Sequence, residues 1–191
     1  MTRPHIIDGW RIDVTLRSGV PRVISRAEAS RVVARALAAG GAPSPASISV
    51  VLTDDDEIAD LNATHLGHEG PTDVLSFPLL PPAAFPPHAG GSRHSTPPGE
   101  AFVLPPRSHP HLGDIAISVE RAVAQASDGR GGQTGDRRWA PADELRLLLT
   151  HGALHICGWD HAEPAEESAM RALERGLLGE ASGARRSRQV T

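Results

Sequence analysis

The 191-residue sequence has no lysine, a single cysteine and no long apolar run. One cysteine cannot form an internal disulfide framework, which favours a reducing compartment, so we expect a cytoplasmic protein. No window of the sequence approaches the roughly 18 apolar residues that a membrane-spanning helix needs. The first residues show no apolar stretch followed by small residues, and we therefore expect no secretory signal.

An excess of basic residues is also lacking. The formal net charge is -4, and all 19 basic residues are arginine. Because nucleic-acid-binding proteins draw much of their affinity from a basic face, the total charge by itself gives no support for such binding. It does not exclude a local basic groove, since arginine suits bidentate contact with phosphate. A GC-rich genome is the simpler explanation of the arginine usage.

Length and composition indicate one soluble domain with a real core. Hydrophobic residues make up 39% of the chain, the mean hydropathy is -0.24, and no internal repeat is visible. We predict a single domain over residues 1–178 that contains a Pro-rich insertion at 80–110. A basic tail without regular structure is expected at 179–191, where the apolar periodicity ends.

Alternation and short apolar runs predict four strands, and helical periodicity with capping signals predicts about five helices. The predicted strands cover residues 10–17, 47–53, 72–80 and 113–118. The predicted helices begin after Ser25, Asp54 and Ser118, at Pro141, and near Glu163. This order indicates an α+β fold with one small mixed sheet and helices packed on it.

The helix predicted from Pro141 is apolar nearly all round and is therefore expected to be buried at the centre of the domain. It carries His151 and His155 four residues apart, so both rings stand on one face, one turn apart. Gly158 is expected to end the helix and to turn the chain, which returns His161 towards the same point. The sequence therefore predicts a metal site on this helix and the turn after it.

A single buried histidine is more often a hydrogen-bonded core residue than a ligand. Three histidines with the H-x3-H-x5-H spacing and a glycine at the turn favour a metal site with an open fourth position. The all-imidazole set suits Zn²⁺, although nickel or another divalent ion would fit the same ligands. We do not expect Cys157 to be a ligand, because free cysteines are usually small core residues.

Asp160 has two possible roles. It could orient a ligand histidine, or it could cap the turn. The motif HxxxHxxGxxH, in which His151 is the first histidine, is also that of metzincin proteases. These place a glutamate after the first histidine as general base, and this chain has Gly152 there. A protease of that class is therefore disfavoured.

The segment HGALHICGWDH (151–161) resembles the signature of the YbeY family of bacterial endoribonucleases. Residues 60–79 (DLNATHLGHEGPTDVLSFPL) and 112–118 (LGDIAIS) are similar to two further blocks of that family, in the same order. The segment 163–178 is similar to the family's terminal helix. The resemblance covers residues 47–178, interrupted by the Pro-rich insertion.

The resemblance implies a zinc- or other metal-dependent endoribonuclease that prefers single-stranded RNA. The family acts in rRNA processing, above all at the 3′ end of 16S rRNA, and in ribosome quality control. The implied partners are precursor rRNA and the small ribosomal subunit; no DNA or membrane partner is expected. His151, His155 and His161 carry over as the metal ligands, and Thr72 and Ser76 are candidates for contacting the RNA backbone.

One departure concerns Leu66, because many members of the family have an arginine there that is regarded as important for activity. His65, His68 or an arginine from elsewhere could supply the missing cation, or the two histidines could simply be surface residues at a helix end. Two other functions stay open. The protein could be a metal-dependent hydrolase of another substrate, or a ribosome assembly factor with a structural metal.

Overall fold

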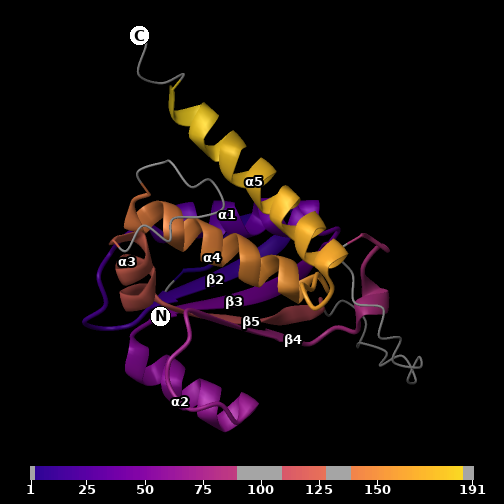
Figure 1. The fold of residues 1–191 in the computed structure, drawn as a ribbon. Helices are drawn as coiled ribbons and strands as arrows, with labels where there is room; N and C mark the ends of the chain where they lie inside the picture. Colours follow the sequence, from indigo (N-terminus) through magenta and orange to yellow (C-terminus); the bar gives the residue numbers. More distant parts are fainter. Residues whose placement is uncertain (1–2, 90–108, 128–138, 187–191) are drawn as a thin grey trace.

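The computed structural model describes residues 3–89, 109–127 and 139–186, with side chains described up to residue 179. Its elements form one α+β unit around a five-stranded mixed sheet (Figure 1). In chain order these elements are β1 (His5–Ile7), β2 (Trp10–Leu16), α1 (Arg26–Ala39), β3 (Ala46–Thr53), α2 (Asp55–Leu66), β4 (Val74–Pro78), the short 3-10 helix η1 (Pro82–Ala84), β5 (His111–Ser118), α3 (Val119–Ser127), α4 (Pro141–Ile156) and α5 (Pro164–Arg186).

The sheet has the order β1-β2-β3-β5-β4, in which β2, β3 and β5 are parallel and the two outer strands are antiparallel to their neighbours. The prediction of four strands was wrong by one, because β1 is only three residues long and too short for alternation to be visible. Its signal is the Asp8-Gly9 pair, which has positive φ angles of 49° and 87° and forms the two-residue hairpin turn to β2.

The capping signals placed the first residues of α1, α2 and α3 correctly. Ser25 accepts a hydrogen bond from the backbone N–H of Glu28, and Asp54 accepts one from that of Glu57. Ser118 caps α3 in the same way through Arg121, at 3.1 Å. Gly67 ends α2 in the left-handed conformation, with φ of 69°.

One predicted boundary differs in the structure. Helix α5 runs past residue 179, where we expected regular structure to stop, to Arg186. Glycine and serine in this stretch weaken a helix without preventing it, since a helix that is already formed adds each residue at little cost. Of the Pro-rich insertion, the structure describes residues 80–89 and 109–110, and Phe85 is buried in the core. The rest of the insertion and residues 128–138 lie outside the described residues.

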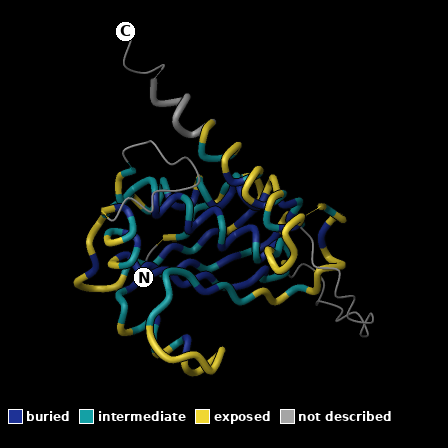
Figure 2. Tube along the Cα trace, viewed as in Figure 1, coloured by how far each residue is buried: buried dark blue, intermediate teal, exposed yellow. Residues whose placement is uncertain are grey.

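Three helices pack on one face of the sheet and one helix packs on the other. Helices α1, α3 and α4 pack on one face over the main core, while α2 packs on the other over a small cluster around Ile58, Leu75 and Ala116. Figure 2 shows the buried positions running through the sheet and α4. Helix α4 contacts α1, α3, α5, β4 and β5, and is thus the central helix that the sequence predicted. Among the described residues, no helix is both long and apolar enough to cross a membrane.

Candidate metal centre

Helix α4 ends in a motif that reverses the chain. The N–H of Gly158 donates to the carbonyl of His155 at 3.0 Å, and the N–H of Trp159 donates to that of Leu154 at 3.1 Å. These two hydrogen bonds define a Schellman motif, and they require the positive φ of 80° at Gly158. The turn brings His161 back over the last turn of α4, as the sequence predicted.

The three histidines meet at one point. One ring nitrogen from each of His151, His155 and His161 lies within 4.8 Å of the other two. The Nε2 atoms of His151 and His155 are 3.0 Å apart. Tetrahedral zinc with Zn–N bonds of about 2.0–2.1 Å places its ligand nitrogens about 3.3 Å apart, so the cluster is close to the required size. His161 is exposed and the other two are half-buried, which leaves the site open to solvent on one side.

The protonation state of His155 suits metal binding. Burial lowers the pKa of His155 to about 4, and repulsion from the two neighbouring histidines adds to this effect. A neutral imidazole keeps the lone pair that a metal needs. The donor set therefore fits a divalent ion that accepts imidazole ligands, such as zinc.

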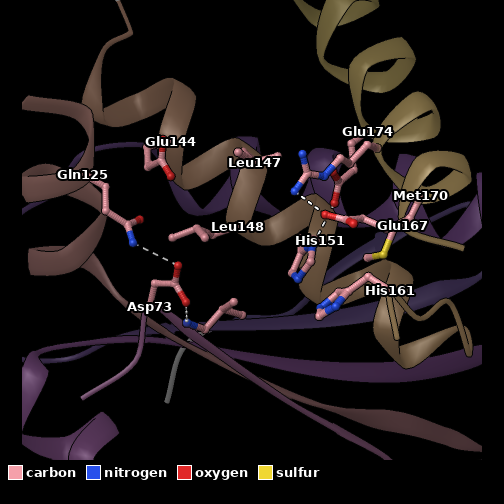
Figure 3. Close-up of a pocket in the computed structure, with 12 residues that line it drawn as sticks. Asp73, Gln125, Glu144, Leu147, Leu148, His151, His161, Glu167, Met170 and Glu174 are labelled. Carbon is pink, nitrogen blue, oxygen red and sulfur yellow. Dashed lines mark hydrogen bonds and ion pairs between the residues drawn. The ribbon is translucent and has the colours of Figure 1, made fainter. Parts of the chain in front are cut away.

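A carboxylate from α5 fixes the first ring. Oε1 of Glu174 lies 2.8 Å from Nδ1 of His151, and the Glu174 side chain is only 3% exposed (Figure 3). With Nδ1 held by the carboxylate, Nε2 of His151 is the nitrogen that points towards the other histidines. Sequence reasoning missed Glu174. The helical spacing of Glu166, Met170 and Glu174, all buried, was the signal that this α5 face turns inward.

The contact of Asp160 favours the turn-capping role over the role of orienting a histidine ring. Its Oδ1 accepts a hydrogen bond from the backbone N–H of His161 at 2.7 Å, which is a turn-capping contact. The carboxylate seen against a histidine ring is Glu174 instead. Cys157 is fully buried beside Gly40, and burial raises the pKa of its thiol to about 12. A thiol that stays protonated and points into the core fits the prediction that Cys157 is no ligand.

Gly152 faces the sheet and not the histidines. A Cβ atom there would lie 2.9 Å from Cγ2 of Ile115 and 3.3 Å from Cγ2 of Val74. Its carbonyl accepts a hydrogen bond from the hydroxyl of Ser76 at 3.2 Å, which ties β4 to α4. A glutamate at this position could not fit without separating α4 from the sheet. The sequence argued against a metzincin protease because Gly152 stands where the general-base glutamate is expected. The packing against the sheet adds that a glutamate would not fit there.

Two hollows adjoin the histidines. One, of about 510 Å³, lies along β4 and is lined by residues that include Leu66, Thr72, Ser76 and all three histidines. We call it the β4 groove. The other, of about 530 Å³, lies between α3, α4 and α5, and four carboxylates line it: Asp73, Glu144, Glu167 and Glu174. We call it the acidic cavity. His151 and His161 line both hollows, so the candidate metal centre lies where the two meet.

Thr72 and Ser76, the candidates for contacting the RNA backbone, line the β4 groove together with the histidines, although both hydroxyls have protein partners. The Thr72 hydroxyl donates to Asp73 at 3.3 Å, and that of Ser76 donates to Gly152. Leu66 is 53% exposed at the end of α2 and also lines the β4 groove. Among the described lining residues, this groove contains no arginine.

Three histidines from one helix and its following turn, open to solvent, form a group that could hold a metal ion with a free coordination position, as catalytic metal sites do. The model of the family Endoribonuclease YbeY matches residues 18–182. The chain is 37% identical to the endoribonuclease YbeY of Roseiflexus castenholzii, with 88% of this chain and 91% of that protein covered. It is 41% identical to the one of Symbiobacterium thermophilum, with 78% and 81% covered. The chain belongs to the YbeY family of endoribonucleases.

A solved structure also aligns with this chain. The solution structure of TM1509 from Thermotoga maritima has a TM-score of 0.49 and 19% sequence identity, and the alignment covers 91% of this chain and 93% of that one.

Proposed function

We propose that this protein is a zinc-dependent endoribonuclease that cleaves single-stranded RNA and matures the 3′ end of 16S rRNA on the small ribosomal subunit. The observation that carries the proposal is the convergence of His151, His155 and His161 beside two open hollows, in a chain of the YbeY family. The buried thiol of Cys157 is compatible with work in the reducing cytoplasm.

Residues around the three histidines would orient the metal ligands and hold the groove in shape. When bound, a zinc ion supplies Lewis acidity, which activates a water and polarises a phosphoryl oxygen. Glu174 holds the ring of His151 in one orientation and keeps its Nδ1 engaged. Asp160 fixes the backbone at His161, and Ser76 holds β4 against α4. The β4 groove would take the RNA backbone, with Thr72 and Ser76 at its wall.

The size of the β4 groove supports a single strand as substrate. A groove of about 510 Å³ can hold a small part of an RNA strand and is too small to enclose a double helix. Arginine or lysine normally meets the phosphates of such a strand. Among the described residues that line the groove there is no arginine, so a metal held by the histidines would supply positive charge there.

The test of the proposed function is rRNA end mapping in a bacterial strain depleted of this protein. We expect 16S rRNA with an unprocessed 3′ end on depletion, and correct ends when the wild-type chain is supplied but not when His155→Ala is supplied. Rescue by His155→Ala would instead indicate an assembly factor whose metal is structural. Correct ends on depletion would favour a hydrolase of another substrate.

Leu66 offers a gain-of-function prediction. Because the resemblance places an arginine at this exposed position of the β4 groove, Leu66→Arg should raise cleavage of single-stranded RNA by about tenfold through a new contact to phosphate. The measurement is kcat/KM at two salt concentrations, since a phosphate contact makes binding more sensitive to salt.

Leu66→Gln is the matched control, because it removes the exposed apolar side chain without adding charge. Equal rates for Leu66→Arg and Leu66→Gln, with equal dependence on salt, would show that no phosphate lies near this position.

A further inference from the structure

The acidic cavity extends well beyond the histidines. Residues Glu144, Leu147, Leu148 and His151 line it from one stripe of α4, so the cavity follows about 10 Å of this helix. Figure 3 shows Asp73, Gln125 and Glu144 at one end and the histidines at the other. The far end has no part in holding a metal at the histidines, and its purpose needs a separate explanation.

The cavity has two kinds of wall. Leu147, Leu148 and Met170 form an apolar side along α4 and α5. The far end is polar, with the carboxylates of Asp73 and Glu144 as hydrogen-bond acceptors. A flat ring with polar edges is the kind of ligand that fits an apolar wall next to acceptors.

Both acceptors are held in place by the protein. The Asp73 carboxylate accepts from the N–H of Val74 at 2.9 Å and from Nε2 of Gln125 at 3.0 Å. Glu144 is 4% exposed and accepts from Nε1 of Trp139 at 2.5 Å. Burial raises the pKa of Glu144, and the nearby charge of Asp73 adds to this effect. A ligand that donates a further hydrogen bond would offset the cost of burying this carboxylate.

The negative charge of the acidic cavity indicates which part of an RNA strand it can bind. Its lining contains four carboxylates and one arginine, Arg171, which forms an ion pair with Glu167. Phosphate would be repelled here, whereas a base carries no charge and presents donors at its edge. Asp and Glu are the usual acceptors for an exocyclic amino group such as N4 of cytosine.

We propose that the acidic cavity binds one nucleobase next to the cleaved bond, and that Asp73 and Glu144 select bases with an exocyclic amino group over uracil. The proposal rests on the proposed endoribonuclease function, because it assigns the phosphate to the histidines and the β4 groove and the base to the cavity. It makes the enzyme selective for sequence within single-stranded RNA, which a metal centre alone would not achieve.

Cytosine and uracil provide the sharpest comparison, because they differ on this edge by an amino group against a carbonyl oxygen. Oligoribonucleotides that differ only by C or U at the positions flanking the cleaved bond should show about tenfold higher kcat/KM for C. Glu144→Gln should bring this ratio close to one, since an amide can donate to the uracil oxygen. Asp60→Asn, an equal charge change at an exposed position of α2 on the opposite face of the sheet, should keep the wild-type ratio.

A binding measurement separates this proposal from the proposed function. Cytidine and uridine are titrated against the His155→Ala protein, in which no cleavage is required, and cytidine should bind about tenfold more tightly. Leu147→Ala, which removes part of the apolar wall at a half-buried position, should weaken the binding of both nucleosides. This second variant keeps the proposal testable even if Glu144→Gln fails to fold.

The outcomes are distinct. Cleavage of RNA with no C/U preference, together with equal nucleoside binding, would overturn the nucleobase site and leave the endoribonuclease standing. Absence of RNA cleavage by the wild-type protein would overturn the proposed function, and tighter cytidine binding would still support the cavity's selectivity. Failure of cytidine to bind would overturn the nucleobase site.

Discussion

Replacement of His155 by alanine is expected to remove the bound metal and to lower cleavage of single-stranded RNA by at least about 1000-fold. His155 is the central member of the cluster, with its Nε2 atom 3.0 Å from that of His151 and its ring 5.1 Å from that of His161. Its lowered pKa keeps it neutral and ready to bind over the whole physiological range. Two remaining histidines would leave half of a tetrahedral shell to solvent.

The measurement pairs metal analysis of the purified protein with cleavage of a single-stranded RNA. His109→Ala is the matched control, because His109 is exposed and lies outside both hollows. Thermal unfolding of each variant shows whether the fold persists. Full cleavage by a metal-free His155→Ala protein would contradict the proposed mechanism, and full metal content in that variant would contradict the assignment of the ligands.

Replacement of Glu174 is expected to weaken metal binding by about 10- to 100-fold, with a parallel loss of cleavage at limiting metal. The carboxylate is almost fully buried and contacts Nδ1 of His151 from a different helix. Without it, the His151 ring can rotate or present the wrong nitrogen, and the affinity for metal falls although all three ligands remain. Glu174→Gln keeps an acceptor but removes the charge, so its effect should lie between the wild type and Glu174→Ala.

Competition with a chelator measures this effect directly, and saturating metal should restore most of the cleavage by Glu174→Gln. Such restoration distinguishes a residue that positions a ligand from one that only stabilises α5. Asp60→Asn again serves as the control for loss of one negative charge. If Glu174→Gln bound metal as tightly as the wild type but unfolded at a lower temperature, Glu174 would have a purely structural role.

The sequence predicted the parts of the site that depend on neighbours along the chain. The four-residue spacing of His151 and His155 is fixed by helix geometry, and Gly158 marks the turn because few other residues tolerate its backbone conformation. The caps at Ser25 and Asp54 are local for the same reason, since each side chain bonds a backbone group three residues away. Such signals need no knowledge of the rest of the fold.

Local sequence patterns did not predict features that depend on the length of an element or on its packing in the fold. Strand β1 is too short for a periodic signal, and only its Asp-Gly turn marks it. The end of α5 was placed too early, because the loss of apolar periodicity marks the end of packing and not the end of a helix. In the same way, the sequence showed only that Gly152 cannot act as a general base. The structure shows that a Cβ atom there would lie 2.9 Å from Cγ2 of Ile115, so a larger residue does not fit.

The sequence alone was enough to predict the cluster of three histidines and the helix and turn that carry it. It also indicated the family, through three similar motif blocks. Only the tertiary structure showed that Glu174, 23 residues after His151, supports that ring, and that Asp73 and Glu144 face one cavity beside it. These side chains come from α4, α5 and the residue just before β4, which are brought together by burial of apolar surface. Burial has no fixed spacing along the chain, so the partners of a site on different elements cannot be read from periodicity.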